Sequence, residues 1–160
     1  MKSIRNIYLI TLIAFSSLAC SQSGAPMSIL DAGKAYFFSP VSMQIYRDGQ
    51  PVVGANVVRR WEHSTIEQDE STTDAEGKVN FPEVRRRTIV QVIPAEFVVA
   101  QQIIVVVEGE EIEVWSNSKR DSAINSELGG KPLNFRCELN DEEQLHRDFG
   151  SAFFTKCTWE

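Results

Sequence analysis

From Tyr36 onward, short apolar stretches alternate with turn residues along most of the chain. Residues 42–47 alternate strictly, with Met43 and Ile45 on one face. Asp48-Gly49 follows as a tight-turn signal, because glycine adopts positive φ without steric penalty. This spacing of strands and turns predicts an all-β fold, an antiparallel β-sandwich of about 7–9 strands.

The next stretch repeats this alternation of strand and turn. Residues 51–55 form a second bend that leads into a strand over residues 56–62. Residues 74–77 begin with Asp and end with Gly, as a type I turn prefers. That turn joins a strand ending near Thr73 to a strand over residues 78–81.

The longest apolar stretch covers residues 97–108 and is rich in Val and Ile. This composition favours a central strand over a helix. Glu108-Gly109-Glu110 then turns the chain into a strand over residues 111–118. Residues 88–93 predict one further strand.

The remaining segments are more polar. Residues 119–131 end in Gly129-Gly130 and predict a loop, whereas residues 140–148 are strongly polar and predict a short helix. Residues 20–34 contain Ser, Gly, Pro and small side chains, and they predict a flexible tether. We therefore expect a signal peptide over 1–19, a tether over 20–34 and a single domain over 35–160.

The first 19 residues have the parts of an export signal. Lys2 and Arg5 precede an apolar stretch over residues 7–15 that is too short to span a bilayer. Leu18-Ala19-Cys20 resembles the lipobox core of bacterial lipoprotein signals, although Ser17 stands where that family most often has Leu. The resemblance implies lipidation of Cys20 and a lipid-anchored protein of the bacterial cell envelope. Cleavage as an ordinary secreted protein and an uncleaved anchor are the alternatives.

The charge of the chain limits the classes of partner that it can bind. Without Lys2 and Arg5, 14 basic residues face 22 acidic ones, a formal charge of −8. Nucleic acid and anionic lipid headgroups are therefore poor partners for the chain as a whole, although a local basic patch changes this. By resemblance to the sorting rule of lipoproteins, Ser21 rather than Asp after the cysteine implies the outer membrane, with the domain facing the periplasm.

Two further cysteines, Cys137 and Cys157, each fall on the apolar face of an alternating segment. An exported protein lies in an oxidising compartment, which favours a disulfide bond between them. The alternative is a metal site with His146 as a third ligand. Zinc sites normally show ligands two to four residues apart, and this spacing is missing, so we expect a disulfide and no metal.

Residues 43–58 and 72–81 together resemble the carboxypeptidase-regulatory-like domain, a transthyretin-like or immunoglobulin-like β-sandwich. The shared features are Gly49-Gln50-Pro51-Val52 before Gly54-Ala55, then Thr73-Asp74, Gly77 and Phe81. Residues 37–41, 59–62 and 133–139 also resemble an uncharacterised family of small bacterial proteins with this core. The resemblance implies a non-enzymatic module for stability or binding.

Catalytic chemistry has little support in the sequence. His63 and His146 lie in polar segments and are expected to be solvated surface residues. The chain has no Gly-x-Ser-x-Gly elbow, His-Glu-x-x-His motif, Walker loop or dinucleotide fingerprint. The acidic residues at 69, 70, 74 and 76 lack the spacing of a calcium loop. We expect no enzyme activity and no cofactor.

Three groups of residues are candidates for a partner-binding surface, because Trp and Arg are enriched in interfaces. Trp115 lies opposite Ile112 and Val114 in an alternating strand and is expected on the solvent side, unless a loop or the C-terminus covers it. The second group is Arg59, Arg60 and Trp61 together with Arg85, Arg86 and Arg87, because clustered arginines pair with carboxylates of a partner or of the chain itself. The third is the acidic segment at residues 141–143, for which a solvated face is the alternative.

The functional expectation is a protein-binding envelope lipoprotein, and one specific version is an immunity protein against a toxin that acts in the periplasm. The alternative is a structural or glycan-binding envelope module with Trp115 or Trp61 as a stacking platform. A hydrolase that uses His63 or His146 is the third hypothesis.

Overall fold

The computed structural model describes residues 34–87 and 96–159. Nine of its thirteen strands are four residues or longer, and a single 3-10 turn, η2 (Ser126–Leu128), is the helical element of the described residues. The fold is therefore all-β, as the alternation of apolar and polar residues predicts. No helix in the described ranges has the length and apolar character needed to cross a membrane.

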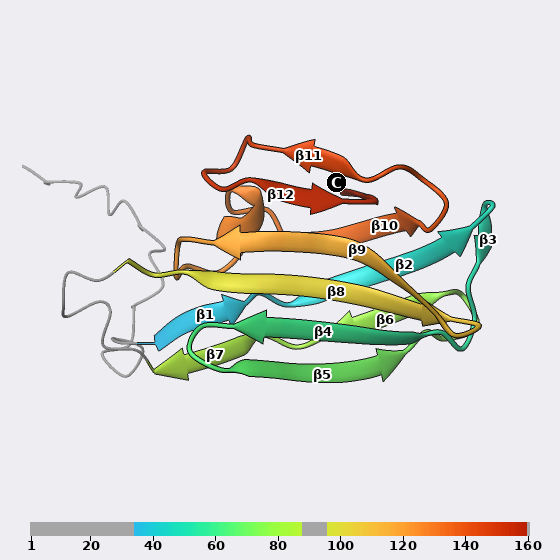
Figure 1. Ribbon diagram of the computed structural model, residues 1–160, viewed down its shortest axis with the longest axis horizontal. Coiled ribbons are helices and arrows are strands. Elements are labelled where there is room, and N and C mark those ends of the chain that lie inside the picture. Colours follow the sequence, from blue (N-terminus) through green and yellow to red (C-terminus); the bar gives the residue numbers. More distant parts are fainter. Residues whose placement is uncertain (1–33, 88–95, 160) are drawn as a thin grey trace, which may run out of the picture.

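One layer is a six-stranded antiparallel sheet (Figure 1). In spatial order its strands are β11 (Gln144–His146), β12 (Phe153–Thr155), β9 (Glu110–Lys119), β8 (Val99–Val107), β4 (Asn56–Glu62) and β5 (Ile66–Thr72). The Val- and Ile-rich strand β8 is central, because β4 and β9 pair along its two edges. The prediction of a central strand at this position is confirmed.

The second layer lies behind this sheet in Figure 1. It contains a five-stranded sheet made of β13 (Cys157–Trp159), β10 (Leu133–Glu138), β2 (Val41–Arg47), β3 (Gln50–Pro51) and β6 (Lys78–Phe81). β10 runs parallel to β2, whereas the other pairs are antiparallel. A separate antiparallel pair joins β1 (Lys34–Phe38) to β7 (Val84–Arg87).

The turns follow the sequence signals. Asp48 and Gly49 both have positive φ between β2 and β3. Gly77 has φ +73° and closes the turn before β6. A Cβ atom there would lie 2.7 Å from the carbonyl oxygen of Ile45, so the position requires glycine for space as well as for conformation.

The core fills the space between the layers. β2 buries Val41, Met43 and Ile45, as its alternation predicts. On the facing sheet, Trp115 lies 4.9 Å from Phe135 and 4.7 Å from Phe153, measured between ring centroids. A core of aromatic and branched side chains gives a domain of this size the apolar burial that holds the two sheets together.

Cys137 and Cys157 form a disulfide bond between the neighbouring strands β10 and β13. Both residues are buried in the core. The expected pairing and its inward direction are therefore confirmed. The bond fixes the C-terminal strand to the five-stranded sheet.

Two expectations about local structure have other outcomes. Residues 140–148 do not form the expected helix, because residues 144–146 pair with β12 as the edge strand β11. The expected strand at residues 88–93 lies outside the described residues, as do the signal peptide, Cys20 and most of the tether.

Candidate functional site: the open face of the six-stranded sheet

A row of directly paired residues crosses the outer face of the six-stranded sheet. Each member is the register partner of the next, from one edge strand to the other. The row consists of Leu145, Phe154, Ser116, Gln102, Arg60 and Gln68. Alternation along each strand places these side chains opposite the core. We call this surface the open face.

One end of the row is apolar and exposed. Phe154 is 42% exposed, and its cross-strand neighbour Leu145 is 43% exposed. Near the centre of the face, Ile104 is 7% exposed yet does not belong to the core cluster. Adjacent exposed apolar side chains of this kind mark interaction sites more often than isolated ones do.

The middle of the row is polar and held in place. The Arg60 guanidinium donates to the side-chain oxygens of Gln102 at 3.1 Å and Gln68 at 3.4 Å. Gln102 donates in turn to Glu113 on β9. A guanidinium that is oriented by amide oxygens keeps further N–H groups for a partner carboxylate or carbonyl.

A shallow hollow lies beside Arg60 on this face. Its volume is about 250 Å³, and its lining includes Ile66, Ala100, Gln102 and Ser118. This shape fits an inserted side chain of a partner better than an enclosed small molecule.

Trp115 points away from this face. The side chain is fully buried between Phe135 and Phe153, so the expectation that it lies on the solvent side is wrong. The physical reason is an irregular register in which Ile103 pairs with Trp115 but Ile104 pairs with Glu113. This bulge puts both Val114 and Trp115 on the core side.

Arg59 and Trp61 also point inward and are buried, which removes them as partner-binding candidates. The Arg59 guanidinium donates to both carboxylate oxygens of Asp69 and to the carbonyl oxygen of Pro82. It also lies over the Phe81 ring, 4.8 Å from the centroid. Arg59 is therefore an internal ion-pair partner, which is the alternative considered for this cluster.

The three arginines of β7 are exposed at one end of the sandwich. Arg86 pairs with Glu67 at 2.7 Å, and Arg85 pairs with Glu83 at 3.3 Å. The Arg86 guanidinium also lowers the pKa of Glu67 through a hydrogen bond and its charge. These two arginines thus have intramolecular partners, as the alternative for this group expects.

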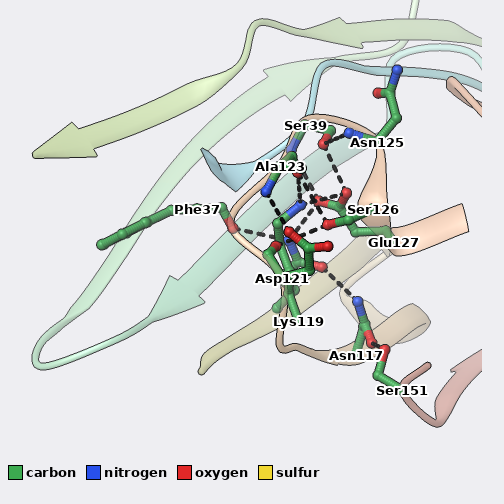
Figure 2. A network of polar contacts seen from close by, with 11 residues as sticks. Phe37, Ser39, Asn117, Lys119, Asp121, Ala123, Asn125, Ser126, Glu127 and Ser151 are labelled. Carbon is green, nitrogen blue, oxygen red and sulfur yellow. Dashed lines mark hydrogen bonds and ion pairs between the residues drawn. The ribbon is translucent and has the colours of Figure 1, made fainter. Parts of the chain in front are cut away.

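A buried polar network fixes the loop that follows β9 to the sandwich (Figure 2). Lys119 and Glu127 form an ion pair with side-chain exposures of 1% and 0%. Glu127 also accepts hydrogen bonds from the Ser39 hydroxyl and backbone N–H and from the Gln101 amide. Asn117 donates to Gln101 and accepts from Ser151, which extends the network to the 147–152 loop.

The network sets the ionisation of its carboxylate. Burial alone would raise the pKa of Glu127, but the Lys119 ammonium and the hydrogen bonds from Gln101 and Ser39 outweigh it and hold the pKa below the usual value. Burial lowers the pKa of Lys119, and the Glu127 charge opposes that shift. The four donors to Glu127 favour its ionised form.

A hollow of about 370 Å³ lies over this network, lined in part by Arg120, Ile124 and Phe149. Each buried charged group beneath it has a partner within the protein. The arrangement is therefore explained by the structure of the loop, which folds across the end of the six-stranded sheet.

The two histidines are less exposed than the sequence suggests. His63 packs against Phe37 with ring centroids 5.0 Å apart, and its Nδ1 donates to the Val98 carbonyl oxygen at 2.9 Å. His146 stacks on Phe153 with centroids 5.1 Å apart. Both side chains keep intermediate exposure, so the expectation of solvated histidines holds only in part, because aromatic neighbours pack against each ring.

The acidic residues have separate surroundings. Asp69 pairs with Arg59, whereas Asp74 accepts backbone hydrogen bonds from Glu76 and Lys78 within its own turn. In the described ranges, no group of three or more His, Cys, Asp or Glu side chains is arranged to hold a metal ion. Glu142 and Glu143 are exposed.

Sequence reasoning missed the apolar end of the open face. Phe153-Phe154 is a visible pair, and alternation requires that one of the two faces outward. The partner of Phe154 was hidden, because Leu145 lies in the segment expected to be helical. The charged network was also missed, since its members come from four separated segments of the chain.

The comparisons with known proteins give a family and no activity. A family model described as a domain of unknown function, DUF6795, matches residues 41–142. No curated protein and no solved structure matches the chain. The matched region runs from β2 to the segment before β11 and contains most of the sandwich. The chain belongs to the DUF6795 family.

Proposed function

We propose that this protein is a non-enzymatic lipoprotein of the bacterial envelope that binds another protein through the open face. The observation that carries the proposal is the row across the six strands, in which exposed Leu145 and Phe154 lie at one edge and Arg60, held by Gln102, lies three strands away. Aromatic residues and arginine are the types most enriched at the energetic centres of protein interfaces.

The proposed partner has a complementary surface. An apolar side chain would cover Phe154 and Leu145, and a carboxylate or carbonyl group would accept from Arg60. The proposed anchor is a lipid on Cys20, the first residue of the tether over residues 20–34. About 15 residues of extended chain reach roughly 50 Å, so the domain can meet a partner away from the bilayer surface.

The test is affinity capture of the full chain, with its native signal, from solubilised envelopes. The proposal predicts one stoichiometric protein partner that is lost when Phe154→Glu places a charge on the open face. The matched control is Val53→Glu, because Val53 is also exposed and apolar but lies in the bend before β4. Equal recovery of the partner with both variants would contradict the assignment of the face.

A specific version of the proposal is an immunity protein. In this version the partner is a toxin that enters the periplasm, and binding prevents it from acting on the producing cell. Cells that lack the protein would be killed by toxin-producing neighbours, and Phe154→Glu would fail to restore protection whereas Val53→Glu would restore it.

Two other functions predict different results. Recovery of bulk envelope material without a stoichiometric protein would favour a structural or glycan-binding module. Turnover of an ester or glycoside that is lost in His63→Ala or His146→Ala would favour a hydrolase.

A further inference from the structure

The outer face of the five-stranded sheet carries a second, chemically different surface. Two cross-strand rows lie on it, and both consist of polar side chains. The first row is Asn134, Ser42 and Asn80, from β10, β2 and β6. The second is Thr158, Arg136, Gln44 and Lys78, from β13, β10, β2 and β6.

These rows line a groove of about 390 Å³. Ser42 donates to the side-chain oxygen of Asn80 at 2.8 Å, which leaves the Asn80 amide N–H₂ to face solvent. Asn134 is exposed on the neighbouring strand. The groove therefore presents amide and hydroxyl groups at the regular spacing of adjacent strands, about 4.8 Å. Such an array can hydrogen-bond several hydroxyl groups of one ligand.

The groove is also cationic. Arg136 and Lys78 are exposed in the same row, and among the described residues neither has a carboxylate partner within ion-pair distance. In a chain with a formal net charge of −6, two such cations in one row, separated by Gln44 alone, are unexpected. The segregation of charge raises the affinity of this face for anions.

Two carboxylates on the turns beside this sheet are bonded to backbone groups rather than to Arg136 or Lys78. Glu138, at the end of β10, accepts the backbone N–H groups of Asp48 and Gly49. Asp74 accepts the backbone N–H groups of Glu76 and Lys78. Both carboxylates therefore stabilise turns at the margin of the sheet.

The Arg136 guanidinium is held flat. It lies over the Tyr46 ring, 3.7 Å from the centroid. Stacking on an aromatic ring orients the planar guanidinium and leaves its edge N–H groups open, which is the geometry for a bidentate contact with a carboxylate or phosphate. Lys78 supplies a second point charge on the far side of β2.

We propose that this groove binds an anionic glycan, with Arg136 and Lys78 on its acidic groups and Asn134, Ser42 and Asn80 on its hydroxyl groups. A ligand that carries many hydroxyl groups and regularly spaced negative charges matches both rows. Its hydroxyl groups would face the first row, and its charges would face Arg136 and Lys78 in the second. The groove lies on the five-stranded sheet, whereas the open face lies on the six-stranded sheet. Glycan binding in the groove therefore does not depend on the proposed protein partner.

The test uses the full-length chain purified in detergent and two soluble polysaccharides. Polygalacturonate carries a carboxylate on each sugar, and dextran carries none. We expect polygalacturonate to bind and dextran not to bind, by isothermal titration calorimetry. The double variant Arg136→Gln/Lys78→Gln should weaken binding by about tenfold or more, because two charge-assisted contacts are lost.

The matched control is Arg86→Gln/Arg120→Gln, which removes the same charge from exposed arginines outside the groove. The affinity of this control for polygalacturonate should stay within about twofold of wild type. Those two arginines influence the groove only through long-range electrostatics, which salt screens. Circular dichroism and thermal unfolding should show that both double variants remain folded. Equal weakening by the two variants, equal binding of dextran, or no binding of polygalacturonate would each overturn the proposal.

Discussion

Lys119 Nζ lies 2.7 Å from Glu127 Oε2 inside the sandwich, and neither side chain is more than 1% exposed. This ion pair joins the end of β9 to the 3-10 turn of the loop that follows it. Ser39 and Gln101 complete the hydrogen bonds of the carboxylate. A buried ion pair with complete hydrogen bonding stabilises one particular loop conformation. Removing only one partner lowers stability strongly, because the other charge stays buried without a counter-charge.

Replacing one partner of the ion pair should therefore lower the free energy of unfolding strongly. Glu127→Gln leaves the Lys119 ammonium buried without its counter-charge, and we expect a loss of about 3–5 kcal/mol in the free energy of unfolding. Urea denaturation followed by tryptophan fluorescence measures the loss. Glu142→Gln, at an exposed position, is the control and should change the stability by less than about 0.5 kcal/mol. Equal effects of the two substitutions would show that the buried pair adds no stability.

The same network gives the protein an acid-labile component of stability. Because the folded-state pKa of Glu127 is lowered, the unfolded chain binds more protons at acidic pH than the folded chain does. This stability is present above the unfolded-state pKa of a glutamate, about 4.3, and is lost as the pH falls through the lowered folded value. Urea denaturation at a series of pH values should show a steeper acid loss for wild type than for a Lys119→Met/Glu127→Leu double variant. Parallel curves would contradict this origin.

The disulfide bond should be measurable in both mass and stability. Intact mass under non-reducing conditions should be lower by two hydrogens than after reduction, because Cys137 and Cys157 are joined. Their separation is 20 residues, and closing a loop of that size contributes about 3 kcal/mol in the chain-entropy model. Cys137→Ser/Cys157→Ser should lose stability of this order in urea denaturation. An unchanged midpoint would remove the bond as a stabilising element.

Cys20 carries the proposal for the anchor. Cys20→Ala should move the protein from the membrane fraction to the soluble fraction, because the acyl chains would have no attachment site. Cell fractionation with immunoblotting checks the result. Residence of Cys20→Ala in the membrane fraction would contradict lipid anchorage, whereas Ser21→Ala serves as the control and should remain with the membrane.

Alternation and turn residues were sufficient to predict most strands. β2, β4, β8 and β9 follow apolar patterns that local rules interpret directly, and the turns at Asp48-Gly49 and before β6 need glycine at positive φ. The segment at residues 140–148 was mistaken for a helix. Its strand β11 has three residues and exists only because β12 provides a pairing edge, which is a tertiary effect.

Side-chain direction was harder to predict than strand position. A single bulge at Val114 and Trp115 reverses the alternation and moves Trp115 into the core. Arg59 lies on the core side of a strand whose pattern is otherwise apolar, and its burial requires Asp69 from the adjacent strand. Neither the bulge nor the ion pair can be recognised in a single sequence, so Trp115 and Arg59 are predicted at a binding surface.

Site-specific photocrosslinking in intact cells can show whether a protein binds the open face. A photoreactive amino acid would replace Phe154 in one variant and Val53 in another. We expect one strong crosslinked protein from position 154, which is absent from position 53. Absence of a crosslinked protein at position 154, or the same products from both positions, would contradict a protein partner on this face.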